Sequence, residues 1–142
     1  ADVVGLPPDL IRRLLDADAK IVAPDCVTAP GGPSYDLNTF LEVADPSVAT
    51  YYRHCRDGLF QPPPEYRGRR HLDDLRFMTR TPLHGVGGAT LLVHADVHRA
   101  GLEFPEIPYR DLLETEAFGR LAHDCGVVPV GLPRVTVIHA RN

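Results

Sequence analysis

The chain has 142 residues, of which 24% are charged and 44% hydrophobic, the size and composition of one globular domain. These values exclude wholesale disorder, a coiled coil and collagen, and the net charge of −4 argues against nucleic acid as a partner. The longest apolar stretch, Val86 to Val93, is too short to cross a bilayer, which takes about 20 residues. Because the chain opens on Ala1 without an initiator methionine, we expect residues 1–142 to be a single domain cut from a longer protein.

The first residues predict a strand–helix–strand unit. Val3-Val4 reads as the end of a buried strand, and a helix is expected to begin at Pro7-Pro8, where the missing proline N–H costs nothing. Apolar side chains then recur at helical spacing over residues 10–15, and Lys20 to Ala23 reads as a second strand. Strand, helix and strand in succession favour an α/β fold.

The middle of the chain is rich in loops. Pro24 to Ser34 contains many prolines and glycines and predicts a loop, and short helices are expected at Thr39 to Glu42 and at Pro46 to Asp57. Gln61 to Arg70 is rich in proline and arginine and reads as an exposed loop. His71 to Arg80 fits either a strand or a short helix.

The last third is expected to build the core. Gly85 to Ala95 predicts the central strand of the sheet, and Val97 to Pro108 predicts a loop. Tyr109 to Cys125 is the clearest helix, because its apolar residues form one stripe, and we expect this helix to pack on the central strand. Val127 to Val130 and Arg134 to His139 read as the last two strands.

Two acidic residues on this expected helix differ in their placement. Glu114 stands four residues before Phe118, which puts it inside the apolar stripe, where a carboxylate is costly to bury without a partner. It is therefore either a functional acid or a surface acid that stabilises the positive end of the helix dipole. Glu116 points away from the stripe and, by itself, reads as a solvated side chain.

A cluster of glycines precedes the expected central strand. Gly85, Gly87 and Gly88 would allow a ligand or another backbone segment to come close. The cluster is not the G-x-G-x-x-G pattern of dinucleotide-binding proteins, and a simple turn is the plainer explanation.

His94, Asp96 and His98 form another polar cluster. If the strand continues through them, their side chains share one face, and histidine with aspartate suits a transition metal. Such a site would support a metal-dependent hydrolase. The plainer alternative is a strand that leaves the sheet with solvated side chains, because Arg99-Ala100-Gly101 reads as a surface turn.

Two further residues stand at strand ends. His139 closes the last expected strand, and ligands tend to bind at the carboxyl ends of strands in α/β sheets. Asp2 lies just before Val3 and is a strand-end acid too if its strand begins upstream. We therefore expect Asp2 and His139 to converge at one edge of the sheet, close enough to share an ion.

Several short motifs, taken in order, resemble one known family. They are Ala1-Asp2-Val3-Val4, Tyr35-Asp36-Leu37-Asn38, Gly85-Val86-Gly87-Gly88, Ala95-Asp96-Val97-His98-Arg99, Phe104-Pro105, Glu114-Thr115-Glu116, Gly131-Leu132-Pro133 and His139. With this order and spacing the chain resembles the fungal mannan-polymerase family of Golgi α-mannosyltransferases, GT-A glycosyltransferases that use GDP-mannose. The resemblance is strongest from Leu83 to His139 and loosest from Ala44 to Arg80.

The resemblance implies a fold and an activity. The fold is a GT-A-like mixed sheet flanked by helices, whose nucleotide-binding N-terminal half lies outside this chain. The activity is retaining transfer of mannose from GDP-mannose to a mannan or glycoprotein glycan acceptor. Alternatively, the chain belongs to a non-catalytic subunit of a glycosyltransferase complex, and related subunits are implied partners. The implied location is the Golgi lumen, with a membrane anchor outside this chain.

The resemblance also implies roles for particular residues. It assigns a divalent metal, Mn²⁺, to Asp2 and His139, which agrees with the need of a diphosphate leaving group for a hard cation. It places two acids, Glu114 and Glu116, near the sugar and the acceptor. The residues implied at the substrate are Tyr35, Asp36, Asn38, Gly85, Gly87 and Gly88. The chain departs from the family pattern at His84, where an acid is usual, and at His94, where lysine is usual.

Overall fold

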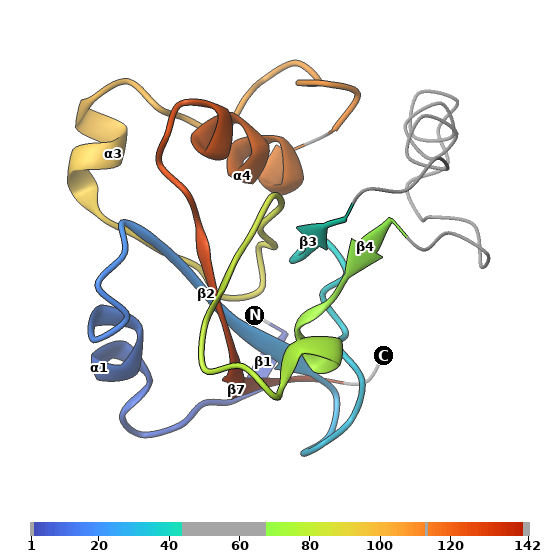
Figure 1. Ribbon diagram of the computed structural model, residues 1–142. Coiled ribbons are helices and arrows are strands. Elements are labelled where there is room, and N and C mark those ends of the chain that lie inside the picture. Colours follow the sequence, from blue (N-terminus) through green and yellow to red (C-terminus); the bar gives the residue numbers. More distant parts are fainter. Residues whose placement is uncertain (1, 44–67, 113, 141–142) are drawn as a thin grey trace.

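The computed structural model describes residues 2–43, 68–112 and 114–140, which build a mixed α/β structure around one main sheet (Figure 1). The strand order in this sheet is β1-β7-β2-β6, and β5 pairs with β7 off this path. β2 and β7 run parallel, whereas the other pairs are antiparallel, so the mixed sheet expected from the sequence is confirmed. The strands are β1 (Val3–Gly5), β2 (Ile21–Val27), β5 (Thr81–Pro82), β6 (Leu92–Val93) and β7 (Val130–His139).

Short helices and a small second sheet complete the described structure. The helices are α1 (Leu10–Leu15), the 3-10 turn η1 (Leu72–Leu75), α3 (Ala95–Arg99) and α4 (Glu114–Asp124). Strands β3 (Leu41–Glu42) and β4 (Arg69–Arg70) pair with each other and lie beside α4 (Figure 1).

Strand β2 is buried along its whole length, and its two faces belong to two different cores. Successive side chains of a strand point to opposite faces. Val22 accordingly packs with Leu14 of α1, while Ile21 packs on the other face with Phe118 of α4. The central strand of the protein is therefore β2, with helices covering both of its faces.

The pairing of β2 with β7 changes register halfway along. Pro24 lies opposite Leu132, but the next residue, Asp25, lies opposite Thr136, so residues 133–135 of β7 bulge out of the ladder. Proline has no N–H to donate and is tolerated in a sheet at such irregularities. This is why β2 continues to Val27, where the sequence predicted a loop from Pro24 onward. For the same reason β7 is one strand instead of the two expected.

Two other expected elements are wrong. The segment Thr39–Glu42, expected as a helix, ends in strand β3. The segment Gly85–Ala95, expected as the central strand, supplies only β6 at the edge of the sheet. Its glycine-rich start leaves the sheet because Gly85 pairs with Phe40 instead. The segment His71–Arg80 takes the helical alternative, as η1.

Helix α4 begins at Glu114, later than the expected start at Tyr109. Residues 109–112 form a tight turn instead, in which Tyr109 and Leu112 exchange backbone hydrogen bonds of 2.9 and 3.0 Å. Arg110 and Asp111 have φ angles of +50° and +63° in this turn. Those values lie in the left-handed region, which does not continue a right-handed helix.

Some expectations fall on residues whose placement is not described. The helix expected at Pro46–Asp57 and most of the loop expected at Gln61–Arg70 lie outside the described residues. Within that second segment, Arg69 and Arg70 belong to β4 and Arg69 is buried, so the expectation of an exposed loop is wrong at its end.

The expected packing of α4 on the Gly85 segment is confirmed, and it depends on a glycine. A Cβ atom at Gly119 of α4 would lie 2.7 Å from the backbone nitrogen of Val86 and 3.0 Å from the carbonyl carbon of Gly85. No side chain fits there unless the helix moves. Contact between backbones thus sets the height of α4 above the Gly85–Gly88 loop.

Replacing Gly119 by alanine should lower the free energy of unfolding by about 1–3 kcal/mol, the usual cost of overpacking, because α4 must shift away from Val86. Urea denaturation monitored by circular dichroism measures this change. Gly88→Ala is the matched control, since a Cβ at Gly88 would meet only Thr115 Cγ2 at 3.4 Å, an ordinary contact. Equal losses in the two variants would contradict the packing argument.

Candidate functional site

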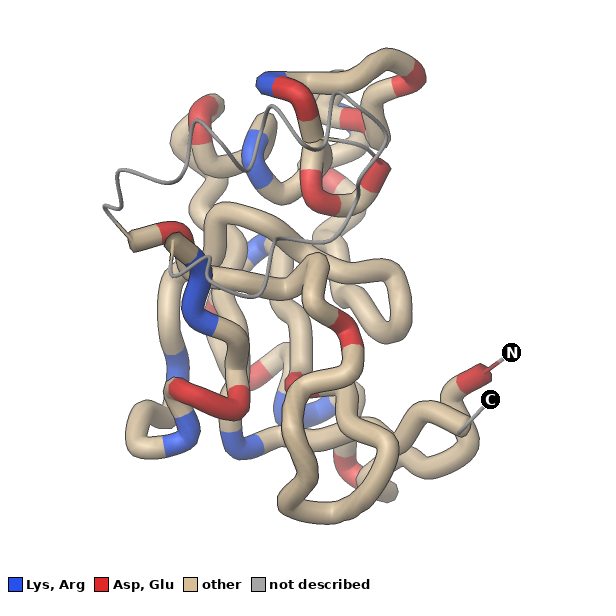
Figure 2. Tube along the Cα trace, turned by 90° about the vertical axis from the view of Figure 1, so that its right-hand side faces the viewer, with Lys and Arg blue, Asp and Glu red and all other residues tan. Residues whose placement is uncertain are grey.

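A hollow of about 500 Å³ lies at the edge of the main sheet where β2 and β7 end. The first and last parts of the described chain lie side by side at this edge, where Ala140 bonds to Asp2 (Figure 2). Most of the lining residues are ones that the sequence singled out for substrate or metal. The hollow, called here the Asp2–His139 hollow, is lined by Asp2, Val3, Tyr35, Asp36, Asn38, Gly88, Ala89 and His139.

Asp2 reaches this edge from the start of a strand. Strand β1 runs antiparallel to β7, so Val3 lies opposite His139, and the Ala140 N–H donates to the carbonyl oxygen of Asp2 over 2.6 Å. The expectation that Asp2 stands at a carboxyl strand end is therefore wrong, because Asp2 precedes β1. It still lies at the same edge as His139, since the two strands run in opposite directions.

His139 is held in one tautomer. Its Nδ1 lies 2.7 Å from the carbonyl oxygen of Ala140, and because a carbonyl oxygen only accepts, Nδ1 carries the proton. In the neutral ring this bond leaves the lone pair on the other nitrogen, Nε2, as in metal-binding histidines whose second nitrogen donates to a carbonyl. The ring of Tyr35, 43% exposed, lies against the imidazole with the ring centres 4.2 Å apart.

Asp36 joins the two loops that form the wall of the hollow. Its carboxylate accepts hydrogen bonds of 3.2 Å from the backbone N–H groups of Asn38 and Ala89. Gly87 packs so closely on this carboxylate that a side chain at position 87 would overlap it. The Gly87 N–H in turn donates to the hydroxyl of Thr39 over 2.8 Å. Asp36 therefore shapes the hollow by fixing its backbone.

Of the three glycines singled out by the sequence, only Gly88 lines the hollow. A Cβ at Gly85 would overlap the ring of Phe40, and Gly87 faces Asp36, so the structure places these two against other parts of the protein. Gly88 is exposed, and a Cβ built on it would lie 3.4 Å from Thr115 Cγ2. The first turn of α4 thus stands beside the hollow.

The burial of the two acids is the reverse of the expectation. Glu114 is exposed, whereas Glu116 is buried with only 7% of its surface accessible. Glu114 is the first residue of α4 and has a φ of +46°, so its side chain does not follow the direction that a helical wheel predicts. Glu116 is buried because the β3–β4 pair covers its side of the helix.

Glu116 is paired with Arg69 of β4. The two guanidinium nitrogens lie 2.8 Å from Oε1 and 3.2 Å from Oε2, and the side chains are 3% and 10% exposed. The guanidinium carbon also sits 3.6 Å above the ring centre of Phe40. Both carboxylate oxygens of Glu116 are thus engaged inside the protein, in the two-point geometry typical of arginine–carboxylate pairs.

The strand face expected to carry His94, Asp96 and His98 is not formed. Residues 95–99 are helix α3, His94 caps it by accepting from the Asp96 N–H, and His98 Nδ1 donates to the Leu102 carbonyl over 2.9 Å. Among the residues that the structure describes, no three or more His, Cys, Asp or Glu side chains are grouped so as to hold a metal ion. The structure therefore gives no support to the hydrolase alternative.

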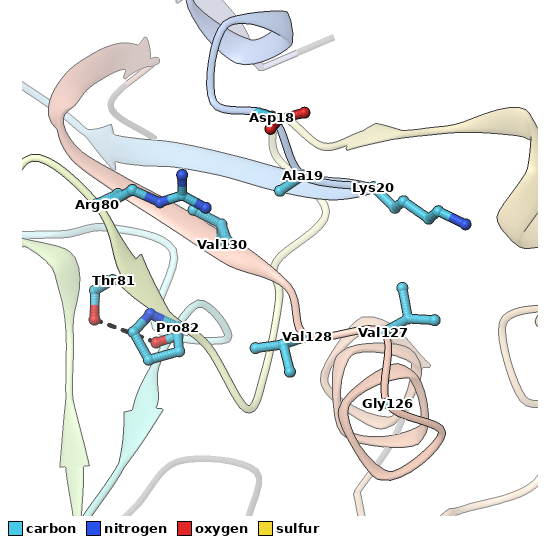
Figure 3. Close-up of a pocket in the computed structure, with 10 residues that line it drawn as sticks. All are labelled: Asp18, Ala19, Lys20, Arg80, Thr81, Pro82, Gly126, Val127, Val128 and Val130. Atoms are coloured by element: carbon cyan, nitrogen blue, oxygen red, sulfur yellow. Dashed lines mark hydrogen bonds between the residues drawn. The ribbon is translucent and has the colours of Figure 1, made fainter.

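A second hollow, of about 490 Å³, lies at the other edge of the main sheet (Figure 3). It lies near the starts of β2 and β7, and Figure 3 shows Val127 and Val128 lining it from the segment after α4. None of the residues predicted for a site borders it. Ligands of α/β sheets gather at the carboxyl ends of the parallel strands, which favours the Asp2–His139 hollow as the candidate site.

Comparison with known proteins places the chain in a family. Its residues 1–108 match the Anp1 family. The chain belongs to the Anp1 family.

Several relatives are named as subunits of mannan polymerase complexes. The chain is 31% identical to the mannan polymerase I complex VAN1 subunit of Saccharomyces cerevisiae, over 98% of the chain and 28% of the relative. It is 31% identical to the vanadate resistance protein of Candida albicans, over 98% and 34%. It is 30% identical to the mannan polymerase complex subunit mnn9 of Schizosaccharomyces pombe, over 98% and 44%. The chain thus spans less than half the length of these relatives.

No helix within residues 2–43, 68–112 and 114–140 of this Anp1-family chain has the length and apolar character needed to cross a membrane.

Sequence reasoning missed two residues that shape the site. Arg69 and Arg70 are adjacent arginines, and nothing in the local sequence distinguishes them. Only the fold brings Arg69 to Glu116, 47 residues further along the chain. Thr39 lies directly after the Tyr35–Asn38 block, and its hydroxyl supports Gly87. The only available signal for Thr39 was this adjacency.

His84, where the family usually has an acid, accepts a hydrogen bond of 3.0 Å from the Glu42 N–H through Nδ1. Burial, with the neighbouring His123 and Arg120, lowers its pKa below 6.5, while Glu42 and Asp124 oppose this shift. The unfolded chain therefore takes up a proton at His84 more readily than the folded one. The contribution of neutral His84 to the free energy of unfolding is therefore full above pH 6.5 and is lost as the pH falls through the folded-state pKa.

The free energy of unfolding should therefore fall between pH 7 and pH 5, and by less in the variant His84→Asn. Asparagine keeps an acceptor for the Glu42 N–H but cannot take up a proton in this range. Urea titrations of both proteins at pH 7, 6 and 5 test this, with exposed His98→Asn as the control. Parallel pH dependence of the wild type and His84→Asn would show that His84 is not the group responsible.

Proposed function

We propose that this Anp1-family chain forms part of a mannan polymerase subunit and that its Asp2–His139 hollow binds GDP-mannose for retaining transfer of mannose to a mannan or glycoprotein glycan. The observation that carries the proposal is the gathering of Asp2, Tyr35, Asp36 and His139 in one hollow at the ligand edge of the sheet. The names of the relatives support the mannan part of the proposal.

The side chains at this edge fit part of a Mn²⁺ site. Asp2 offers carboxylate oxygens, and His139 offers an Nε2 whose lone pair is left free by the bond from Nδ1 to Ala140. Oxygen and imidazole nitrogen suit Mn²⁺, and two protein ligands leave room for the oxygens of a diphosphate. When bound, the ion would neutralise the charge that develops on the leaving GDP.

The remaining residues around the hollow orient the sugar and the acceptor. The exposed ring of Tyr35, tilted by 30° against the ring of His139, presents an apolar face on which a sugar ring can pack. Gly88 leaves the backbone open to the substrate beside Thr115. The exposed carboxylate of Glu114 can stabilise positive charge on the sugar or orient the acceptor hydroxyl. Glu116 does neither, because Arg69 holds both of its oxygens.

A non-catalytic role within the complex is the second candidate. The relatives are named as complex subunits, and one of the two acids implied at the sugar is neutralised inside the protein. In this case the hollow would support a partner subunit that carries out transfer. Both candidates place the protein in the Golgi lumen with related subunits as partners.

The metal assignment predicts that His139→Ala in the full-length protein weakens Mn²⁺ binding at least tenfold, because an imidazole ligand is lost. Calorimetric titration with MnCl₂ measures the affinity. His98→Ala is the control, since His98 is exposed and bonded within its own loop. Unchanged Mn²⁺ affinity in His139→Ala would remove the metal site.

Glu114→Gln separates the two candidate functions. If the subunit is catalytic, the variant should keep its stability and lose transfer from GDP-mannose by about a hundredfold or more, since an electrostatic contact of the transition state is lost. Exposed Glu106→Gln is the control for a surface charge. Transfer that survives in Glu114→Gln, or that is absent from the wild type when partner subunits are removed, would favour the non-catalytic role.

A further inference from the structure

The buried pair of Arg69 and Glu116 connects three segments that surround the candidate site. Arg69 belongs to β4, Glu116 to the first turn of α4, and the guanidinium of Arg69 lies 3.6 Å above the ring centre of Phe40. Phe40 is fully buried and exchanges backbone hydrogen bonds with Gly85 over 3.2 and 3.3 Å. The Arg69 guanidinium thus contacts both helix α4 and Phe40, which pairs with Gly85 at the start of the glycine loop.

The first turn of α4 needs an external support. Glu114 begins the helix at a φ of +46°, a conformation that costs free energy for any residue except glycine. The preceding turn at residues 109–112 contains two more positive φ angles. A helix entered through such a backbone is held in place by its tertiary contacts. In this turn Glu116 accepts two hydrogen bonds from Arg69, of 2.8 and 3.2 Å.

The position of this turn matters for the hollow. Thr115 stands next to Gly88, which lines the hollow, and Glu114 precedes Thr115 in the chain. A shift of about 1 Å in a group that acts on substrate can reduce a rate by about a hundredfold. Whatever fixes Glu116 therefore also fixes where the Glu114 carboxylate stands.

We propose that Arg69 is a positioning residue: its two-point ion pair with Glu116 fixes the first turn of α4, which stands beside the Asp2–His139 hollow, and so fixes the position of the exposed carboxylate of Glu114 in that turn. The effect on transfer rests on the proposed function, whereas the effect on the helix does not. Glu116 is accordingly a positioning residue as well, because both of its carboxylate oxygens are bonded to Arg69.

The experiment uses the full-length protein, four variants of the pair and one control variant. Arg69→Met removes the charge at similar length, Arg69→Lys keeps the charge without the planar fork, and Glu116→Gln keeps the shape of the carboxylate. Arg69→Met combined with Glu116→Met removes both charges of this pair, so that neither member stays buried opposite a missing partner. Arg13→Met, which breaks the exposed Arg13–Asp9 pair of 2.9 Å on α1, is the control.

The first readout is hydrogen exchange, which does not depend on activity. The amides of Phe118 and Gly87 should exchange at least tenfold faster in Arg69→Met, because α4 and the glycine loop lose a common support, and should be unchanged in Arg13→Met. Arg69→Lys should fall between the two. Unchanged exchange in Arg69→Met would overturn the proposal.

The second readout is steady-state transfer from GDP-mannose. Each single variant at Arg69 or Glu116 should lower kcat tenfold to a hundredfold with little change in KM for GDP-mannose or in Mn²⁺ affinity. The double variant should regain thermal stability but not kcat, and Glu116→Gln should keep the wild-type pH profile.

Recovery of kcat together with stability in the double variant would show that the pair has only a structural role. Loss of one limb of the pH profile in Glu116→Gln would show that Glu116 is an acid–base group. Absence of transfer from the wild type would contradict the proposed function and leave the exchange result standing.

Discussion

The parallel pairing of β2 with β7, broken between Pro24 and Asp25, is the constraint on which the structure depends. Both hydrophobic cores form on the two faces of β2, and the two strands end together at the edge that carries the Asp2–His139 hollow. A buried carboxylate also lies at this break. Asp25 is buried there and accepts hydrogen bonds from Ser34 over 2.6 Å and from Arg76 over 2.7 Å. Burial raises the pKa of this carboxyl group, while these two partners favour its charged form.

The site at that edge is built from loops, and charged side chains give the loops their shape. Asp36 fixes the backbone of the glycine loop from within the hollow, and Arg69 fixes the first turn of α4 from behind it. Of the carboxylates predicted from the sequence to bind metal or to act on substrate, Asp36 and Glu116 are engaged by the protein itself. Asp2 and Glu114 are the exposed ones, and they remain for metal and sugar in the proposed function.

Sequence patterns predicted which residues lie at the edge of the sheet better than they predicted the positions of the two acids on α4. That Asp2 and His139 line one hollow agrees with the motif order and with the position of His139 at the end of its strand, both of which are local signals. The placement of Glu114 and Glu116 was wrong because a helical wheel assumes a regular helix start and ignores partners from elsewhere in the chain. Glu114 begins α4 outside the helical range of φ, and Glu116 is covered by Arg69, which no pattern around either residue foretells. The extent of β2 was missed because a proline inside a strand is tolerated only where the pairing slips.

The central claim is that a divalent cation binds at the Asp2–His139 hollow. Paramagnetic line broadening by Mn²⁺ in backbone NMR spectra tests it residue by residue and without any assumption about catalysis. Substoichiometric Mn²⁺ should first broaden the amides of Tyr35, Gly88 and Ala140, while those of Ala19 and Val128 at the opposite edge stay sharp. Broadening that begins at Asp96 and His98, or at the opposite edge of the sheet, would contradict it.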